Sequence, residues 1–158
     1  MSKAKLELVE QSEAVRLYSI RFIDKDLTEF ERFLHEFREN AELNKDFQRI
    51  VYAISKILDN GAFERYFRPE GKYSDGVCAV PIESGLLRLY CLRISDQILI
   101  VGNGGVKNTQ KYQEDSLLNG YVITLQKFEK LIRNGIKNGA ISIEEKDFVG
   151  LEEKTYDL

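Results

Sequence analysis

The sequence predicts one α+β domain, because two amphipathic helix patterns are followed by three closely spaced strand patterns. The predicted order is an N-terminal strand, a helical hairpin, an antiparallel three-stranded meander and a C-terminal helix. A chain of this length buries roughly two-thirds of the surface that its unfolded form exposes. We therefore expect a hydrophobic core that needs no disulfide bond.

The N-terminal strand is predicted at 15–22, where apolar residues alternate between two faces. One face carries Val15, Leu17 and Ser19, and the other carries Tyr18, Ile20 and Phe22. A weaker apolar segment at 6–9 is interpreted as an extra edge strand. Residues 1–14 are accordingly an N-terminal extension of a domain that spans 15–143.

The helical hairpin begins at Thr28, which forms a capping box with Glu31. The apolar face of the first helix comprises Phe30, Phe33, Leu34 and Phe37. The second helix has its apolar face at Phe47, Ile50, Val51, Ile54 and either Ile57 or Leu58, and it stops at Asn60-Gly61. Because the polar link at 40–45 is short, the two helices are expected to be antiparallel.

The meander follows an aromatic and basic connector at 63–71, which Pro69 prevents from being helical. Its strands are predicted at 77–82, 86–94 and 97–101, with short turns between them. The stretch 98–101 lacks alternation and is expected to be covered on both faces. The glycine-rich, basic stretch after it is expected to be a loop.

The C-terminal helix is predicted to begin at Thr124 and to end near Asn134-Gly135 or Asn138-Gly139. Its apolar face comprises Leu125, Phe128, Leu131 and Ile132. Residues 140–143 form a short final strand or an arm. The segment 144–158 is a charged C-terminal tail, of which 146–158 is expected to be at the surface or partly disordered.

The residue composition limits which functions, location and redox state we expect for this protein. The formal net charge of −3 argues against a protein that binds nucleic acid over its whole surface, although it allows a local basic patch. No apolar run approaches the roughly 20 residues of a membrane span, so we expect a cytoplasmic protein with no membrane partner. Cys78 and Cys91 are interpreted as reduced core thiols, with a disulfide between neighbouring strands as the alternative.

Two kinds of site are excluded by residue type and spacing. His35 is the only histidine, and with two separated cysteines it does not make a standard zinc site. The loop at 102–109 has Val106 before Lys107 and no helix directly after it, unlike a nucleotide-binding Walker loop. We therefore expect neither a metal nor another cofactor.

What remains is a set of cations interleaved with tyrosines. The cations are Arg65, Arg68, Arg88, Arg93, Lys107 and Lys111, and the tyrosines are Tyr66, Tyr90 and Tyr112. Strand alternation separates Arg88 from Arg93 onto opposite faces. Since an unpaired buried charge is costly, Arg88 either binds an anion in a groove or pairs with a carboxylate such as Glu64 or Glu70.

The order of elements, together with three short motifs, resembles the RelE/ParE superfamily of bacterial toxins over about 15–132, most closely its HigB-like and phage-derived branch. Leu-Arg-Leu-Tyr at 87–90 is similar to the arginine-bearing strand of that family. Ile-Val-Gly at 100–102, with the basic loop and tyrosine after it, is similar to its Val-Gly-basic run. Lys-Asn-Thr at 107–109 is similar to the Lys-Lys-Thr of HigB-like members.

The resemblance implies a metal-independent endoribonuclease that cuts messenger RNA on the ribosome and is neutralised by a cognate antitoxin. In that interpretation Arg88 holds the scissile phosphate, Lys107 stabilises the transition state and Lys111 assists it. Tyr112 stacks on a base or takes part in proton transfer. The further RNA contacts are assigned to Arg65, Arg68 and Tyr90.

A second class of function stays open beside the first. A non-catalytic RelE-fold protein of a mobile element or phage would keep the sheet without the basic active surface. It would act as an interaction module and use the acidic helical hairpin to bind a protein partner.

Overall fold

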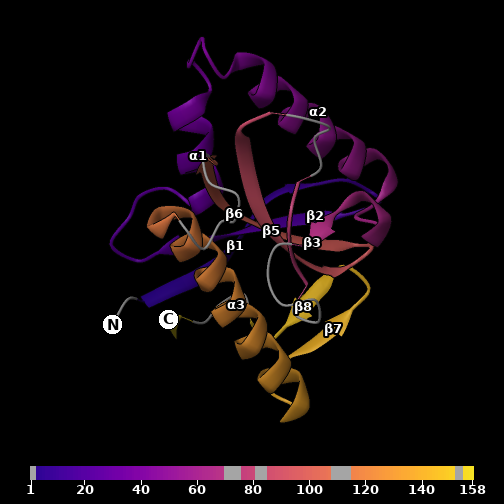
Figure 1. The fold of residues 1–158 in the computed structure, drawn as a ribbon. Helices are drawn as coiled ribbons and strands as arrows, with labels where there is room; N and C mark the ends of the chain where they lie inside the picture. Colours follow the sequence, from indigo (N-terminus) through magenta and orange to yellow (C-terminus); the bar gives the residue numbers. More distant parts are fainter. Residues whose placement is uncertain (1–2, 70–75, 81–84, 108–114, 152–154) are drawn as a thin grey trace.

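The chain forms a mixed β-sheet with helices on both faces (Figure 1), as described for residues 3–69, 76–80, 85–107, 115–151 and 155–158 of the computed structural model. The strands are β1 (Lys3–Gln11), β2 (Arg16–Phe22), β3 (Arg68–Pro69), β4 (Val77–Ala79), β5 (Leu87–Ser95), β6 (Ile98–Val106), β7 (Ser142–Glu144), β8 (Asp147–Val149) and β9 (Tyr156–Asp157). The helices are α1 (Glu29–Phe37), α2 (Asn44–Asn60) and α3 (Ser116–Lys137), with a 3₁₀ turn, η1, at Glu64–Tyr66. The predicted α+β class is confirmed. No helix in these ranges is both long and apolar enough to cross a membrane.

The sheet has the strand order β3-β4-β5-β6-β2-β1-β9 among the described residues, and β7 pairs with β8 in a separate hairpin. The predicted antiparallel meander is confirmed as β4, β5 and β6. The predicted order is incomplete, because β2 joins β6 in parallel, with Arg16 opposite Ile98 and Ser19 opposite Val101. β1 then pairs antiparallel with β2 and is flanked at its start by β9.

Two hydrophobic cores lie on the two faces of the sheet. Ile98 and Ile100 of β6 belong to the core under α3, whereas Leu99 and Val101 belong to the core under α1 and α2. All four side chains are fully buried. The prediction that this strand is covered on both faces is therefore confirmed.

The start of α1 and the end of α2 follow the predicted cap chemistry. The Thr28 hydroxyl accepts the Glu31 N–H at 3.2 Å, and the Glu31 carboxylate accepts the Thr28 N–H at 3.1 Å. Gly61 ends α2 with φ +115°, a conformation that favours glycine. The two helices meet through Phe33 and Phe47, whose ring centroids lie 6.2 Å apart.

The C-terminal helix begins earlier than predicted. Its N-cap is Asp115, whose carboxylate accepts the N–H groups of Leu117 and Leu118, so the predicted start at Thr124 is wrong by two turns. The helix passes Asn134-Gly135 and ends before Gly139, which has φ +83°. The start was missed because Asn119 and Gly120 are weak helix formers and break the apparent helical pattern.

The C-terminal segment is part of the core, contrary to the expectation of a surface or disordered tail. Phe148 is 5% exposed and contacts Tyr18 edge-on, with 5.5 Å between ring centroids, and Leu151 is fully buried. The predicted domain end after residue 143 falls inside β7. Composition failed here because the short uncharged run at 148–151 lies within a segment that is otherwise mostly charged.

The stretch 102–106, predicted to be a loop, continues β6 instead. Gly104 lies opposite Leu89 and Gly105 opposite Arg88 in the antiparallel ladder with β5. A β-carbon at Gly104 would overlap the carbonyl oxygen of Arg88, so only glycine permits this approach of the two strands. The glycines therefore indicate close strand packing rather than a phosphate-binding loop.

Candidate functional site

Arg88 and Lys107 lie together at one end of the β5–β6 ladder. Arg88 is opposite Gly105, and the Lys107 N–H donates to the Leu86 carbonyl at 2.7 Å. Because side chains alternate along a strand, Arg88 and Lys107 share the sheet face covered by α3. Diagonal neighbours of this kind have Cα atoms about 7–8 Å apart. The two cations can therefore approach one anion.

The Arg88 guanidinium is half-buried and contacts backbone carbonyls. Its Nη1 donates to the Gly85 oxygen at 2.8 Å and to the Leu87 oxygen at 3.1 Å. Carbonyl oxygens orient the guanidinium but do not cancel its charge, unlike the carboxylate partner considered in the sequence analysis. Among the residues that the structure describes, the side-chain hydrogen bonds of Arg88 are to these two carbonyls.

Asp46 in the first turn of α2 fixes the backbone beside Arg88. Its Oδ2 accepts the Leu86 N–H at 2.7 Å and the Leu87 N–H at 3.0 Å. This role of Asp46 was missed in the sequence analysis, since an acidic residue at a helix start is ordinarily explained by the helix dipole. The contact spans about forty positions, and no local pattern encodes it.

The start of α3 borders the same face. A β-carbon at Gly105 would lie 3.3 Å from the Leu118 side chain, which places the first turn of α3 over Arg88 and its strand partner. The Asp115 carboxylate already accepts two of the free N–H groups of that turn. Asp115 therefore satisfies part of this helix terminus, and the positive charge on this face comes from Arg88 and Lys107.

Tyr90, predicted to contact RNA, is fully buried in the core beneath α3. Tyr90 is on the same sheet face as Arg88 but lies two residues further along β5, where α3 covers the sheet. A nucleobase cannot stack on this ring while α3 is packed. The burial of Tyr90 disfavours the predicted RNA contact, and an aromatic residue on an alternating strand has the same pattern in a core as on a binding face.

Arg65 lies at the far end of β5 from Arg88. Its guanidinium carbon is 4.7 Å from the Phe63 ring centroid and 5.1 Å from that of Tyr66. This segment is joined to the β5–β6 turn, because Arg93 Nε donates to the Ala62 carbonyl at 2.7 Å. The five residues from Arg88 to Arg93 span about 17 Å. The structure thus separates Arg65 and Arg93 from Arg88, although all three belong to the predicted set of cations.

The other predicted site residues are described only in part. The Arg68 backbone lies in β3 opposite Ala79, and its side chain is outside what the structure describes. Lys111 and Tyr112 also lie outside the described residues. Of the four residues assigned to catalysis, Arg88 and Lys107 are the pair that the structure brings together.

The two cysteines face each other across β4 and β5. Cys78 and Cys91 are free thiols whose sulfur atoms lie 3.5 Å apart. Burial raises the pKa of the Cys91 thiol well above its usual value, so the neutral thiol is the stable form at neutral pH. Both residues are core residues without a catalytic arrangement.

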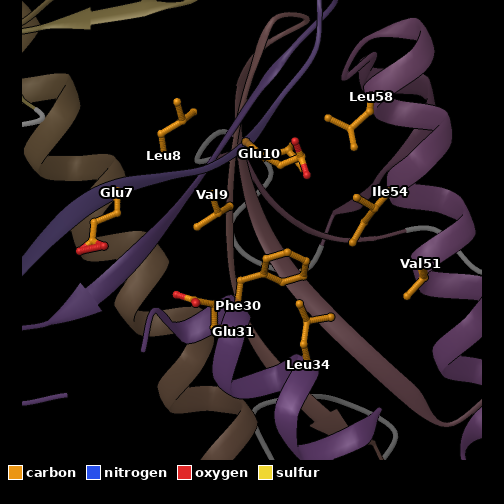
Figure 2. Close-up of a pocket in the computed structure, with 11 residues that line it drawn as sticks. Glu7, Leu8, Val9, Glu10, Phe30, Glu31, Leu34, Val51, Ile54 and Leu58 are labelled. Atoms are coloured by element: carbon orange, nitrogen blue, oxygen red, sulfur yellow. The ribbon is translucent and has the colours of Figure 1, made fainter. Parts of the chain in front are cut away.

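A groove between β1, α1 and α2 was missed in the sequence (Figure 2). It has a cavity volume of about 530 Å³. Its lining residues are Glu7, Leu8, Val9, Glu10, Leu17, Phe30, Glu31, Leu34, Val51, Ile54 and Leu58. The available signal was the apolar face of α2, which is wider than the part that the core buries, since Val51 is 38% exposed.

Comparisons with known proteins find no matching family model, curated protein or solved structure.

Proposed function

We propose that this chain is the toxin-like component of a toxin–antitoxin system and acts as a metal-independent endoribonuclease. The observation that supports the proposal is the pairing of Arg88 and Lys107 on one face at one end of the sheet. A phosphodiester presented there meets two cations whose charges add. The resemblance to RelE/ParE toxins suggests the reaction class, and the proximity of Arg88 and Lys107 supports their proposed role in binding phosphate.

The proposed reaction is attack of the ribose 2′-hydroxyl on the adjacent phosphate. A new bond forms between phosphorus and the 2′-oxygen, the bond to the 5′-oxygen breaks, and the products are a 2′,3′-cyclic phosphate and a 5′-hydroxyl. Arg88 holds the phosphate, Lys107 stabilises the negative charge of the pentavalent transition state, and Lys111 assists. Tyr112 stacks on a base or moves the proton, as the family resemblance implies.

The proposed partners are messenger RNA on the ribosome and a cognate antitoxin. Because the net charge is −3, RNA binding is confined to a local patch rather than the whole surface. Affinity for RNA should then fall with salt, but with a shallow slope that corresponds to a few phosphate contacts.

A second candidate function is the non-catalytic interaction module. Two observations favour it: Tyr90 is buried, and the charged residues that line the groove of Figure 2 are all carboxylates. In this alternative the sheet is a scaffold and the groove is the functional surface.

Induced expression in bacteria separates the two candidates. We expect the native chain to arrest growth, and we expect Arg88→Ala and Lys107→Ala to restore it, because loss of one charge-stabilising group typically lowers such a rate about 10²–10³-fold. Arg65→Ala, at the far end of β5, is the matched control and should still arrest growth. Colony counts are compared at equal protein level.

Arrest that persists unchanged in both variants would contradict the assignment of the site. Growth without arrest by the native chain would contradict the toxin proposal and favour the interaction module.

A further inference from the structure

The groove between β1, α1 and α2 is a part of the sheet face that the helices leave open. α1 packs mainly on β6 and β2, and α2 packs mainly on β5, whereas β1 faces α1 and α2 across the groove. Ser12 Oγ donates to the Leu58 carbonyl at 2.5 Å and closes one end. Figure 2 shows β1 on one side of the groove, α2 on the other and α1 across its base.

The floor of the groove is apolar and partly open to water. Val51 is 38% exposed, and Val9, Leu34 and Leu58 are partly buried, whereas Leu17 is fully buried. Apolar side chains that line a concave surface of this kind gain free energy when a partner covers them. The gain from fully burying one such leucine or valine is about 1.5–3 kcal/mol.

The charged residues that line the groove are all negative: Glu7, Glu10 and Glu31. The Glu7 carboxylate accepts Arg21 Nε at 2.5 Å and is therefore neutralised within the chain. Glu10 accepts the backbone N–H of Gln11, and the Glu31 carboxylate accepts the Thr28 N–H in the cap of α1. In the described part of the chain, no lysine or arginine forms an ion pair with Glu10 or Glu31.

The dimensions favour a helix over a strand. From Val51 to Leu58, α2 rises about 10 Å, and β1 covers a similar length from Glu7 to Glu10. Apolar side chains at positions i, i+4 and i+7 of a docked helix span the same distance. Addition of a strand is disfavoured, because the register of β1 shifts between Leu8 and Glu10 and breaks the regular edge.

We propose that this groove docks an amphipathic helix of a partner protein that presents apolar side chains flanked by lysine or arginine. The apolar residues fill the floor between β1 and α2, and the flanking cations pair with Glu10 and Glu31. The site is on the opposite face of the sheet from Arg88, since Val9 and Leu34 pack with the core under α1 and α2. The proposal therefore stands independently of the ribonuclease activity.

Selection of a phage-displayed library of random 16-residue peptides on the immobilised full chain tests the proposal. We expect the enriched peptides to carry apolar residues at i, i+4 and i+7 and a positive net charge. In fluorescence anisotropy, Val51→Arg should weaken the selected peptides at least about tenfold by placing a cation in the floor. Glu10→Lys should weaken them several-fold, most strongly at low salt.

Matched controls keep these changes interpretable. Tyr52→Arg adds the same charge at the next position of α2, where the side chain is 62% exposed and does not line the groove. Glu36→Lys makes the same charge reversal on α1 outside the groove. Both should bind within twofold of the native chain. Absence of any enriched peptide, enrichment of acidic peptides, or undiminished binding to Val51→Arg would each overturn the proposal.

Discussion

Replacing Gly104 by alanine is expected to destabilise the chain by about 3 kcal/mol or more. The added β-carbon would overlap the carbonyl oxygen of Arg88, which is a backbone atom and cannot rotate away. β5 and β6 must then separate at the point where Arg88 is held. For a chain of this size the change corresponds to a fall in Tm of about 6–12 °C. Thermal unfolding followed by circular dichroism measures it.

The neighbouring glycine provides the control for this result. A β-carbon at Gly105 would meet only the end of the Leu118 side chain, at 3.3 Å, and a leucine methyl group can move aside. Gly105→Ala should therefore change stability by less than about 1 kcal/mol. Equal melting temperatures for the two variants would show that the close approach of β5 to Gly104 is not required.

Replacing Phe148 by alanine is expected to cost about 3 kcal/mol, as large-to-small changes at buried aromatic residues do. Phe148 fills the core between the β7–β8 hairpin and Tyr18 of β2. The hairpin is also held by Lys146, whose Nζ donates to the Glu13 carbonyl at 3.0 Å, and by the ion pair of Arg16 with Asp147. Urea unfolding at constant pH measures the loss.

Val149→Ala is the matched variant, because Val149 neighbours Phe148 in β8 and is 46% exposed. Its free energy of unfolding should stay within about 0.5 kcal/mol of the native value. If Phe148→Ala were equally mild, the C-terminal segment would not belong to the cooperative core, and the expectation of a surface tail would stand after all.

Elements encoded by neighbouring residues could be predicted from the sequence. The capping box of Thr28 and Glu31 and the stop at Gly61 depend on contacts within one turn, and both are confirmed. The two-sided burial of 98–101 follows from its unbroken run of apolar residues, and it too is confirmed. In each case the local chemistry suffices to specify the local structure.

Features that depend on distant contacts could not be predicted in this way. The parallel pairing of β2 with β6 joins segments about eighty residues apart, and the sequence of neither strand indicates which strand it pairs with. The stretch 102–105 has a loop composition, yet it is part of a strand, in which the Arg88 backbone approaches Gly104 and leucine side chains of α3 approach Gly102 and Gly105. Phe148 and Val149 are adjacent apolar residues after a charged run, and only the tertiary contacts reveal that Phe148 is buried while Val149 is exposed.

The candidate site was predicted in part for the same reasons. Arg88 and Lys107 come together because strand alternation and antiparallel pairing are regular. Arg65 and Tyr90 fall outside the site because the packing of η1 and α3 decides where they lie. The Asp46 carboxylate binds the backbone at the start of the strand that carries Arg88. Asp46 belongs to α2, so the sequence pattern of the meander could not predict this contact.

Sequencing of RNA 5′-hydroxyl ends from cells that express the chain tests the central claim most directly, because attack by the 2′-hydroxyl leaves such an end at every cut. With native protein we predict accumulation of these ends at discrete positions in messenger RNA. Arg88→Ala and Lys107→Ala should reduce them by about 10²-fold, and Arg65→Ala should leave them unchanged. Ends that do not rise above the level of uninduced cells, or that rise equally in all variants, would contradict the account.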